Sequence, residues 1–138
     1  MANTQCIPTP TKQAWQQRAT PTTDTYKAAL YTNAGTLGPT STVYTTSGEV
    51  TGTNYTAGGV TLSGATISTS GTSAYITFSS PITFTNVTLS GVTSVVIYNT
   101  SKSNEIVGIY TFTSQSPTAQ NLVLTLPAAG GTAVVRID

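Results

Sequence analysis

Residues 95–98 read Val-Val-Ile-Tyr and residues 106–112 read Ile-Val-Gly-Ile-Tyr-Thr-Phe, and these two stretches decide the fold class. Both are continuous apolar runs of strand length, and the polar residues 101–104 between them are typical of a turn. Runs of this kind indicate strands that are buried on both faces or central in a sandwich. We predict the same for residues 122–126 and 133–137.

Shorter strand signals precede these runs, with apolar residues alternating with threonine and serine as in a half-buried strand. The predicted strands are 26–32, 42–44, 49–50, 60–64, 74–78 and 82–84, the last continuing to 87–89 past a kink near Asn86. Glycine and proline pairs such as Gly38-Pro39, Gly58-Gly59 and Gly130-Gly131 mark the turns. Many short strands with regular turns predict an all-β protein, either a β-sandwich or a jelly roll.

The N-terminal part of the chain differs in composition from the rest. It holds three of the prolines and the single tryptophan, Trp15, so residues 1–24 are interpreted as an N-terminal arm and residues 25–138 as the β domain. A short helix is predicted to run to Ala19, capped by Thr9 or Thr11. A helix of this length is unstable alone in water, so it needs a surface, either its own sheet or a neighbour.

Composition argues against enzymatic chemistry. The chain has no histidine, four carboxylates, 31 threonines and 14 serines. Acid–base and metal-assisted catalysis near neutral pH relies on histidine or on clustered carboxylates. The carboxylates are far apart in sequence and are expected to be solvated or to cap turns; they are Asp24, Glu49, Glu105 and Asp138. We therefore expect a structural or binding module that is not an enzyme, with no metal and no cofactor.

Charge and hydropathy argue against nucleic-acid-binding and membrane-binding proteins. The formal net charge is +1, without a basic cluster, so nucleic-acid binding through phosphates is not expected. No amphipathic basic segment or long apolar run predicts a membrane partner. The first ten residues lack the order of a signal peptide, so the chain is expected in a cytoplasm-like compartment unless it leaves within an assembly.

Aromatic residues are the remaining candidates for binding. The seven tyrosines either line a sugar-binding surface or, as is more usual in strands, lie half-buried with the hydroxyl at the rim. Trp15 anchors the arm either to a groove on its own domain or to a partner.

Several segments, taken together, are similar to a known protein family. They are Tyr-Lys-Ala-Ala-Leu-Tyr-Thr at 26–32, Tyr-Thr-Thr-Ser-Gly-Glu-Val at 44–50 continuing to Gly52, Tyr-Thr-Ala-Gly-Gly at 55–59, Val-Ile-Tyr-Asn at 96–99, and the closing stretch 126–137. This order resembles small virion structural proteins of tailed bacteriophages and prophages, which are capsid cement or decoration proteins, although some carry a tail-protein label. The likeness covers residues 24–138; its most specific part is 49–59, and the arm matches in character alone.

The resemblance implies a β-sandwich or jelly roll that binds the outside of a phage head built from an HK97-like major capsid protein. Such a protein clamps adjacent capsid subunits, is assembled in the bacterial cytoplasm, and carries no catalytic residues. We expect a homodimer or homotrimer whose arm crosses a capsid seam through Lys12, Trp15 and Arg18. The alternatives are a phage tail component and, third, a glycan-binding adhesin.

Overall fold

The computed structural model describes residues 6–127, 133 and 135–138. These residues are mostly in antiparallel strands with one α-helix, which confirms the predicted β class. The elements are α1 Thr9–Ala19, β1 Tyr26–Thr32, β2 Val60–Thr61, β3 Thr66–Ser70, β4 Ser73–Thr77, β5 Ile82–Val87, β6 Val92–Asn99, the 3₁₀ turn η1 Thr100–Lys102, β7 Glu105–Gln115, β8 Gln120–Leu124 and β9 Val135–Ile137. The predicted Gly130-Gly131 turn lies outside the described residues.

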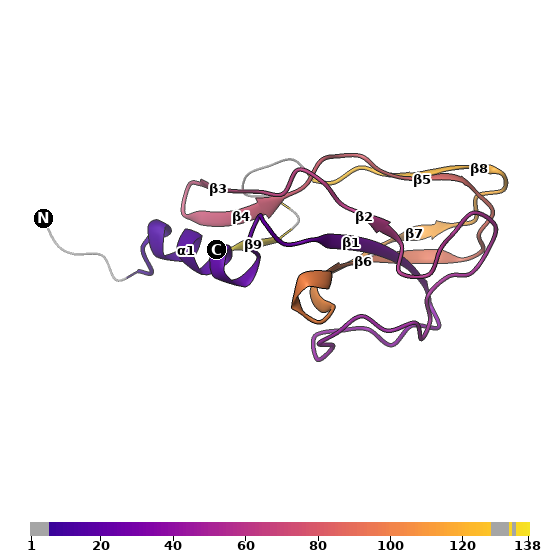
Figure 1. The fold of residues 1–138 in the computed structure, drawn as a ribbon, viewed down its shortest axis with the longest axis horizontal. Helices are drawn as coiled ribbons and strands as arrows, with labels where there is room; N and C mark the ends of the chain where they lie inside the picture. The colour runs from indigo at the N-terminus through magenta and orange to yellow at the C-terminus, as the bar shows by residue number, and fades with distance from the viewer. Residues whose placement is uncertain (1–5, 128–132, 134) are drawn as a thin grey trace, which may run out of the picture.

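The strands form three antiparallel sheets. The largest has the order β2-β1-β6-β7, the second β3-β4-β9, and the third is the β5-β8 pair. Figure 1 shows β5 and β8 running along one side of the four-stranded sheet, while β3, β4 and β9 lie beside α1 at the other end. The four-stranded sheet therefore meets the other two through one of its faces.

The core is centred on β1 and β6, the inner strands of the four-stranded sheet. On one face, Leu30 and Val95 pack in a cluster with Phe84 of β5 and Leu122 of β8. Farther along that face, Ile97 packs in a second cluster, with Tyr26 of β1 and with Ile76 and Phe78. Residues 95–98 are all buried, so the prediction of a strand buried on both faces is confirmed for β6.

The second face of β1 and β6 is covered by part of the segment 33–59, which we call the covering segment; its Val50 and Tyr55 pack with the first face instead. Ala29, Tyr31, Val96 and Tyr98 are buried on this face, against Leu37, Tyr44 and β7 side chains. Figure 1 shows part of this segment, in purple, passing along the lower side of β1 and β6.

The strands predicted at 42–44 and 49–50 are reduced to single bridged residues. The covering segment forms only isolated bridges there, Val43 with Glu105 and Tyr31 with Glu49. Backbone hydrogen bonds flank both bridges: the amide of Val50 donates to Leu30 and that of Thr32 to Gly48, while Tyr44 donates to Asn104 and Ile106 to Thr42. The pairing extends no farther, so neither bridge grows into a strand.

Burial of the other apolar runs differs from the prediction. β7 is mostly half-buried and its last residues are exposed, because it is the outer strand of its sheet. β8 buries only Leu122, and of the described residues in the 133–137 run Ala133 is buried, Val135 and Ile137 are half-buried and Arg136 is exposed. An apolar run identifies a strand, but its position in the sheet decides how many of its faces are covered.

At three places the structure confirms or corrects a local prediction from the sequence. The kink at Asn86 is confirmed, since this residue has φ of 50° and the β5–β8 register shifts between Phe84 and Val87. The strand predicted at 60–64 is reduced to Val60–Thr61. β3 was not predicted, because its Thr-Ile-Ser-Thr-Ser sequence has a single apolar residue, and its pairing with β4 defines it.

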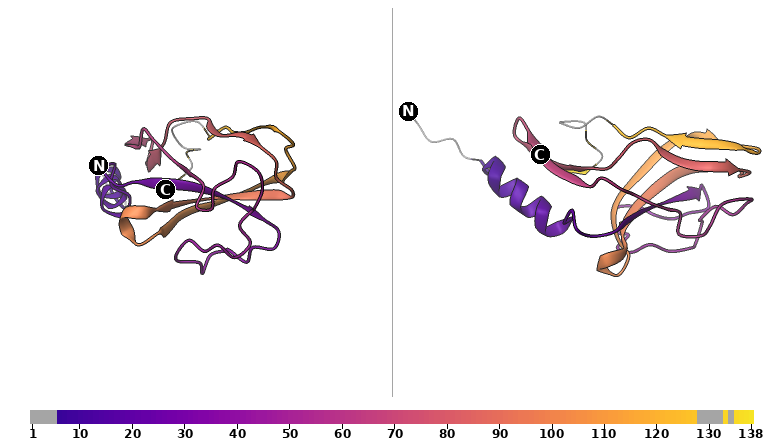
Figure 2. Two further views of the ribbon diagram at one scale, coloured as in Figure 1. Left: turned by 45° about the vertical axis from the view of Figure 1, so that its right-hand side comes forward. Right: turned by 45° about the horizontal axis from the view of Figure 1, so that its top comes forward.

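The predicted helix is confirmed as α1, and the surface it uses is its own domain. It lies against β4, β3 and β9, and Figure 2 shows it inclined at one end of the molecule. Pro8 precedes its first turn and no side chain caps it, so the predicted cap at Thr9 or Thr11 is wrong. Pro10 occupies the first turn, where its missing N–H costs no helical hydrogen bond. No helix in the described part of the chain is long and apolar enough to cross a membrane.

Truncation of a core side chain tests the difference between inner and outer strands. We expect Ile97→Ala, at a side chain with 0% exposure, to lower the free energy of unfolding by about 2–5 kcal/mol. Ile109→Ala in the outer strand β7 should cost clearly less, and Val123→Ala, at 49% exposure, roughly 0.5 kcal/mol or less. Urea unfolding measures all three; equal losses for Ile97 and Ile109 would contradict the assignment of β7 as the outer strand.

Candidate functional site

Polar side chains attach α1 to the sheet. Lys12 and Gln16 are buried, and the Lys12 ammonium donates to the carbonyl of Thr72 at 2.8 Å. At the C-terminal end of the helix, the Lys102 ammonium donates to the carbonyls of Arg18 and Ala19 at 2.8 and 2.9 Å. A cation is favoured there because unpaired carbonyls and the helix dipole carry partial negative charge. Hydrogen bonds therefore fix the orientation of the helix.

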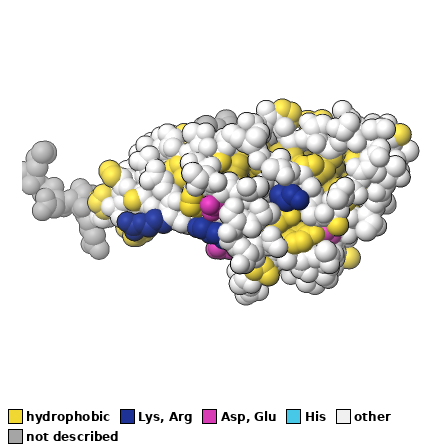
Figure 3. All heavy atoms as spheres, viewed as in Figure 1, with side chains coloured by type: hydrophobic (Ala, Val, Ile, Leu, Met, Phe, Trp, Pro, Cys, Tyr) yellow, Lys and Arg dark blue, Asp and Glu magenta, His cyan; other side chains and the backbone are white. Residues whose placement is uncertain are grey.

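This orientation leaves the larger apolar residues of the N-terminal part outside. Trp15 is 42% exposed, Ile7 is 47% exposed, and Arg18 is exposed. Figure 3 shows hydrophobic and basic side chains side by side at this end of the molecule. Of the three residues predicted to contact a capsid, Lys12 is engaged within the domain, whereas Trp15 and Arg18 remain on the surface.

Glu49 joins separate parts of the covering segment to one another. One carboxylate oxygen accepts a hydrogen bond from the Tyr44 hydroxyl at 2.5 Å. The other oxygen accepts from the Tyr55 hydroxyl and from the Gly58 amide, both at 2.7 Å. The Tyr55 hydroxyl in turn accepts from the Leu30 amide of β1 at 3.0 Å. Glu49 thus has a structural role that the expectation of a solvated or turn-capping carboxylate missed.

Two further tyrosines extend this network. Tyr98 donates to the carbonyl of Gly58 at 2.7 Å and stacks on Tyr44 with ring centroids 4.6 Å apart. Tyr31 donates to the carbonyl of Thr45 at 2.5 Å. The signal in the sequence was the placement of Glu49 between Tyr44 and Tyr55, the most specific part of the family resemblance. We call Glu49 and Tyr31, Tyr44, Tyr55 and Tyr98 the tyrosine–glutamate network.

None of the seven tyrosines, all of which are described, is fully exposed. The expectation that strand tyrosines are buried or lie at the rim is confirmed, and the tyrosines form no exposed aromatic surface for a glycan. Burial raises the pKa of Tyr26, Tyr31 and Tyr110 to about 12. For Tyr44 and Tyr55, burial and then the hydrogen bond to Glu49 raise the pKa further, although the Leu30 amide partly opposes this at Tyr55.

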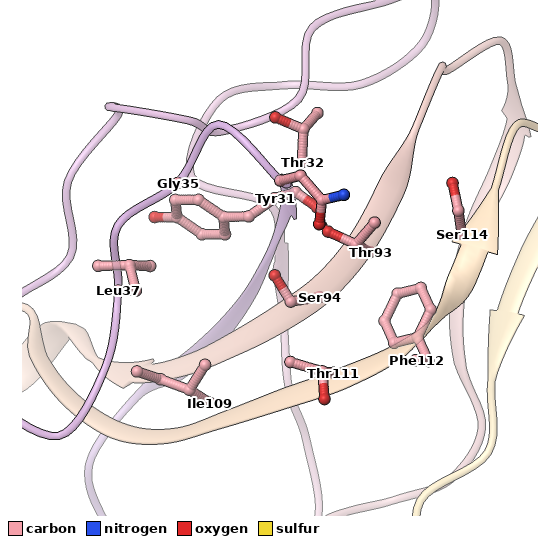
Figure 4. A pocket seen from close by; sticks show the side chains of 11 residues that line it. Tyr31, Thr32, Gly35, Leu37, Thr93, Ser94, Ile109, Thr111, Phe112 and Ser114 are labelled. Carbon is pink, nitrogen blue, oxygen red and sulfur yellow. The ribbon is translucent and has the colours of Figure 1, made fainter.

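A groove lies where the covering segment leaves β1 and passes the start of β6 and the second half of β7 (Figure 4). Its cavity volume is about 410 Å³. It is lined by Tyr31, Thr32, Asn33, Gly35 and Leu37 on one side, and by Thr93, Ser94, Ile109, Thr111, Phe112 and Ser114 on the other. No lining residue is charged.

The groove is built by irregular strand pairing. Neighbouring residues on a regular strand point to opposite faces, yet Thr93 and Ser94, and also Thr111 and Phe112, line the same groove. The register explains this, because it shifts between Val92 and Ser94 on β6, opposite residues 111–115 of β7. Bulges of this kind redirect side chains and are frequent beside functional sites. The sequence carried no signal for the groove that we recognised.

The remaining charged groups do not form a catalytic or metal-binding cluster in the described residues. Asp24 accepts a hydrogen bond from Asn99, and Asp138 pairs with Arg136 and accepts from Ser73. No group of three or more potential metal ligands occurs within residues 6–127, 133 and 135–138. Comparison with protein-family models, with curated proteins and with solved structures found no match to this chain.

Replacement of Glu49 tests the tyrosine–glutamate network. Glu49→Gln removes the charge and turns an amide N–H toward groups that need an acceptor, so we expect a loss of roughly 1–3 kcal/mol in the free energy of unfolding. Glu105→Gln is the matched control, since Glu105 is exposed, and should change stability by about 0.5 kcal/mol or less. Chemical denaturation measures both; equal effects of the two substitutions would show that Glu49 does not hold the segment.

The tyrosine pKa values predict loss of stability in alkali. Each raised pKa means that the folded protein keeps a proton which the unfolded chain releases near pH 10, so stability is full below pH 10 and falls as pH rises toward about 12. Phenolate absorbance should therefore appear together with the loss of circular dichroism. Smooth titration of most tyrosines near pH 10 in a protein that stays folded would contradict this.

Proposed function

We propose that the protein is a structural component of a tailed-bacteriophage virion that binds the outer surface of the head and clamps adjacent subunits of an HK97-like major capsid protein. In this proposal the sheets form a β-sandwich or jelly roll, the class that the sequence resemblance implies. The observation that carries the proposal is the docking of α1, which is held by buried Lys12 and Gln16 and leaves Trp15 and Arg18 outside.

The exposed side of α1 has the chemistry of an interface anchor. Tryptophan and arginine are the residues that most often dominate binding energy, because they combine a large contact area with a directed polar group. A helix already fixed to its own domain loses little conformational entropy when it binds a partner. Trp15 and Arg18 are therefore assigned the capsid contact, and Lys12 is assigned to positioning the helix.

Low charge suits a protein that acts outside the cell. Attachment through apolar and hydrogen-bonding groups depends less on ionic strength than attachment through ion pairs. In the proposal the domain forms a homodimer or homotrimer, so that several α1 helices reach neighbouring capsid subunits. Linked contacts of modest strength then add through effective concentration. This role requires no catalytic group and places the protein on the capsid exterior.

Fractionation of virions tests the proposal directly. Gently disrupted particles are separated into heads and tails, and the protein is measured in each fraction against the major capsid protein. Near-stoichiometric recovery with heads is expected. Recovery with tails would overturn the head-binding proposal and favour a tail component.

Substitution on α1 then tests the contact residues. With expanded heads that lack the protein, we expect Trp15→Ser with Arg18→Glu to weaken binding by roughly 30-fold or more, the effect of losing one interface anchor. Val123→Ser removes an equally exposed apolar group on β8 and should bind like the original protein. Point variants are sharper than removal of residues 1–20, which would also uncover the β4 surface beneath α1. Unchanged binding of the double variant would exclude α1 as the contact.

A further inference from the structure

The groove beside β6 and β7 displays hydroxyl groups that the fold does not use. Ser94, Thr111 and Ser114 make no hydrogen bond through their hydroxyls in the described part of the chain. The exposed amide of Asn33 faces the same hollow from the covering segment. Each of these groups can donate and accept, so together they offer several hydrogen bonds to a ligand that carries both kinds of partner.

Apolar side chains form the rest of the lining. Leu37, Ile109 and Phe112 are half-buried, so one part of each side chain faces the groove and another packs on the domain. Figure 4 shows the Phe112 ring beside Ser114 and Thr111, with Leu37 and Ile109 farther along the groove. A ligand that fits must therefore present an apolar surface next to its hydroxyl groups.

We propose that this groove binds a neutral sugar ring. A pyranose carries hydroxyl groups around its edge and C–H groups on its faces, which matches hydroxyl-bearing residues beside an aromatic and two aliphatic walls. The absence of charged lining residues argues against phosphate, carboxylate or amine ligands, because nothing in the groove would neutralise them. The volume of about 410 Å³ lies within the roughly 300–1,000 Å³ of small-molecule sites.

The shape of the groove is fixed by the fold. Its outer wall, residues 33–37, rests on the turn at Gly48, where φ is 80° and an added Cβ would collide with the backbone of Gly35. Its floor is set by the bulged pairing of β6 with β7. A pre-formed site of this kind needs little reorganisation on binding.

Sugar binding here is independent of the proposed head attachment. The groove begins at Thr32, at the end of β1 farther from α1, as Figure 1 shows. A ligand in the groove would leave Trp15 and Arg18 uncovered. The two activities therefore require separate experiments, and failure of one does not decide the other.

Titration of the full-length, ¹⁵N-labelled protein tests the proposal. The probes are glucose, galactose, N-acetylglucosamine, lactose and maltose, with glucuronate and N-acetylneuraminate as charged comparisons. We expect at least one neutral sugar to shift amide signals of residues 33–37, 93–94 and 109–114, with Kd of the order of millimolar for so small a ligand. The charged sugars should bind more weakly or produce no shift.

Two matched variants complete the test. Thr111→Val with Ser114→Ala removes two hydroxyls from the groove and should weaken binding by roughly 10-fold or more. Thr113→Val changes an exposed threonine on the same strand that does not line the groove, and should bind like the original protein. The proposal is overturned if no neutral sugar shifts these signals, if charged sugars bind better, or if the double variant binds as the control does.

Discussion

The hydrogen bonds to the Glu49 carboxylate tie separate parts of the covering segment together, and the way this segment lies on the central sheet depends on them. They connect Tyr44, Tyr55 and the Gly58 amide to one point, and Tyr55 passes the connection to the backbone of β1. The rest of the 27-residue segment 33–59 is held by backbone hydrogen bonds at two bridges, by the hydroxyls of Tyr31 and Tyr98, and by packing of Leu37 and Tyr44. The second face of β1 and β6 is buried because the segment stays in place, and the same segment forms one wall of the groove.

In a usual amphipathic helix apolar residues face the core, but α1 is attached to the sheet through polar side chains. Here Lys12 and Gln16 face the sheet, while Trp15 is on the outside. One buried polar atom of this attachment is unpaired: the Gln16 side-chain oxygen has no hydrogen-bond partner in the described structure. An unpaired buried acceptor of this kind costs about 1–3 kcal/mol. The proposed capsid contact would cover this exposed side of the helix.

Sequence patterns predicted the elements that have strong local signals. The bounds of β1 agree with the structure, the burial of residues 95–98 is as expected, and both α1 and the kink at Asn86 were anticipated. The errors occur where pairing with a neighbouring strand decides the structure. β7 has the apolar pattern of an inner strand but lies at an edge, and β3 has no apolar alternation but pairs with β4. Local periodicity reports side-chain character, whereas pairing is a long-range property.

The sequence by itself determined the β class, the N-terminal helix and the scarcity of side chains suited to catalysis, because these follow from residue type, short-range periodicity and composition. Only the tertiary structure decided the role of Glu49, the inward direction of Lys12 and the existence of the groove. Each of these depends on residues distant in sequence, such as Lys12 with Thr72 or Thr32 with Ser114. A linear pattern cannot specify such contacts, since they are set by the order of strands and by the register shifts in the pairing of β6 with its two neighbours.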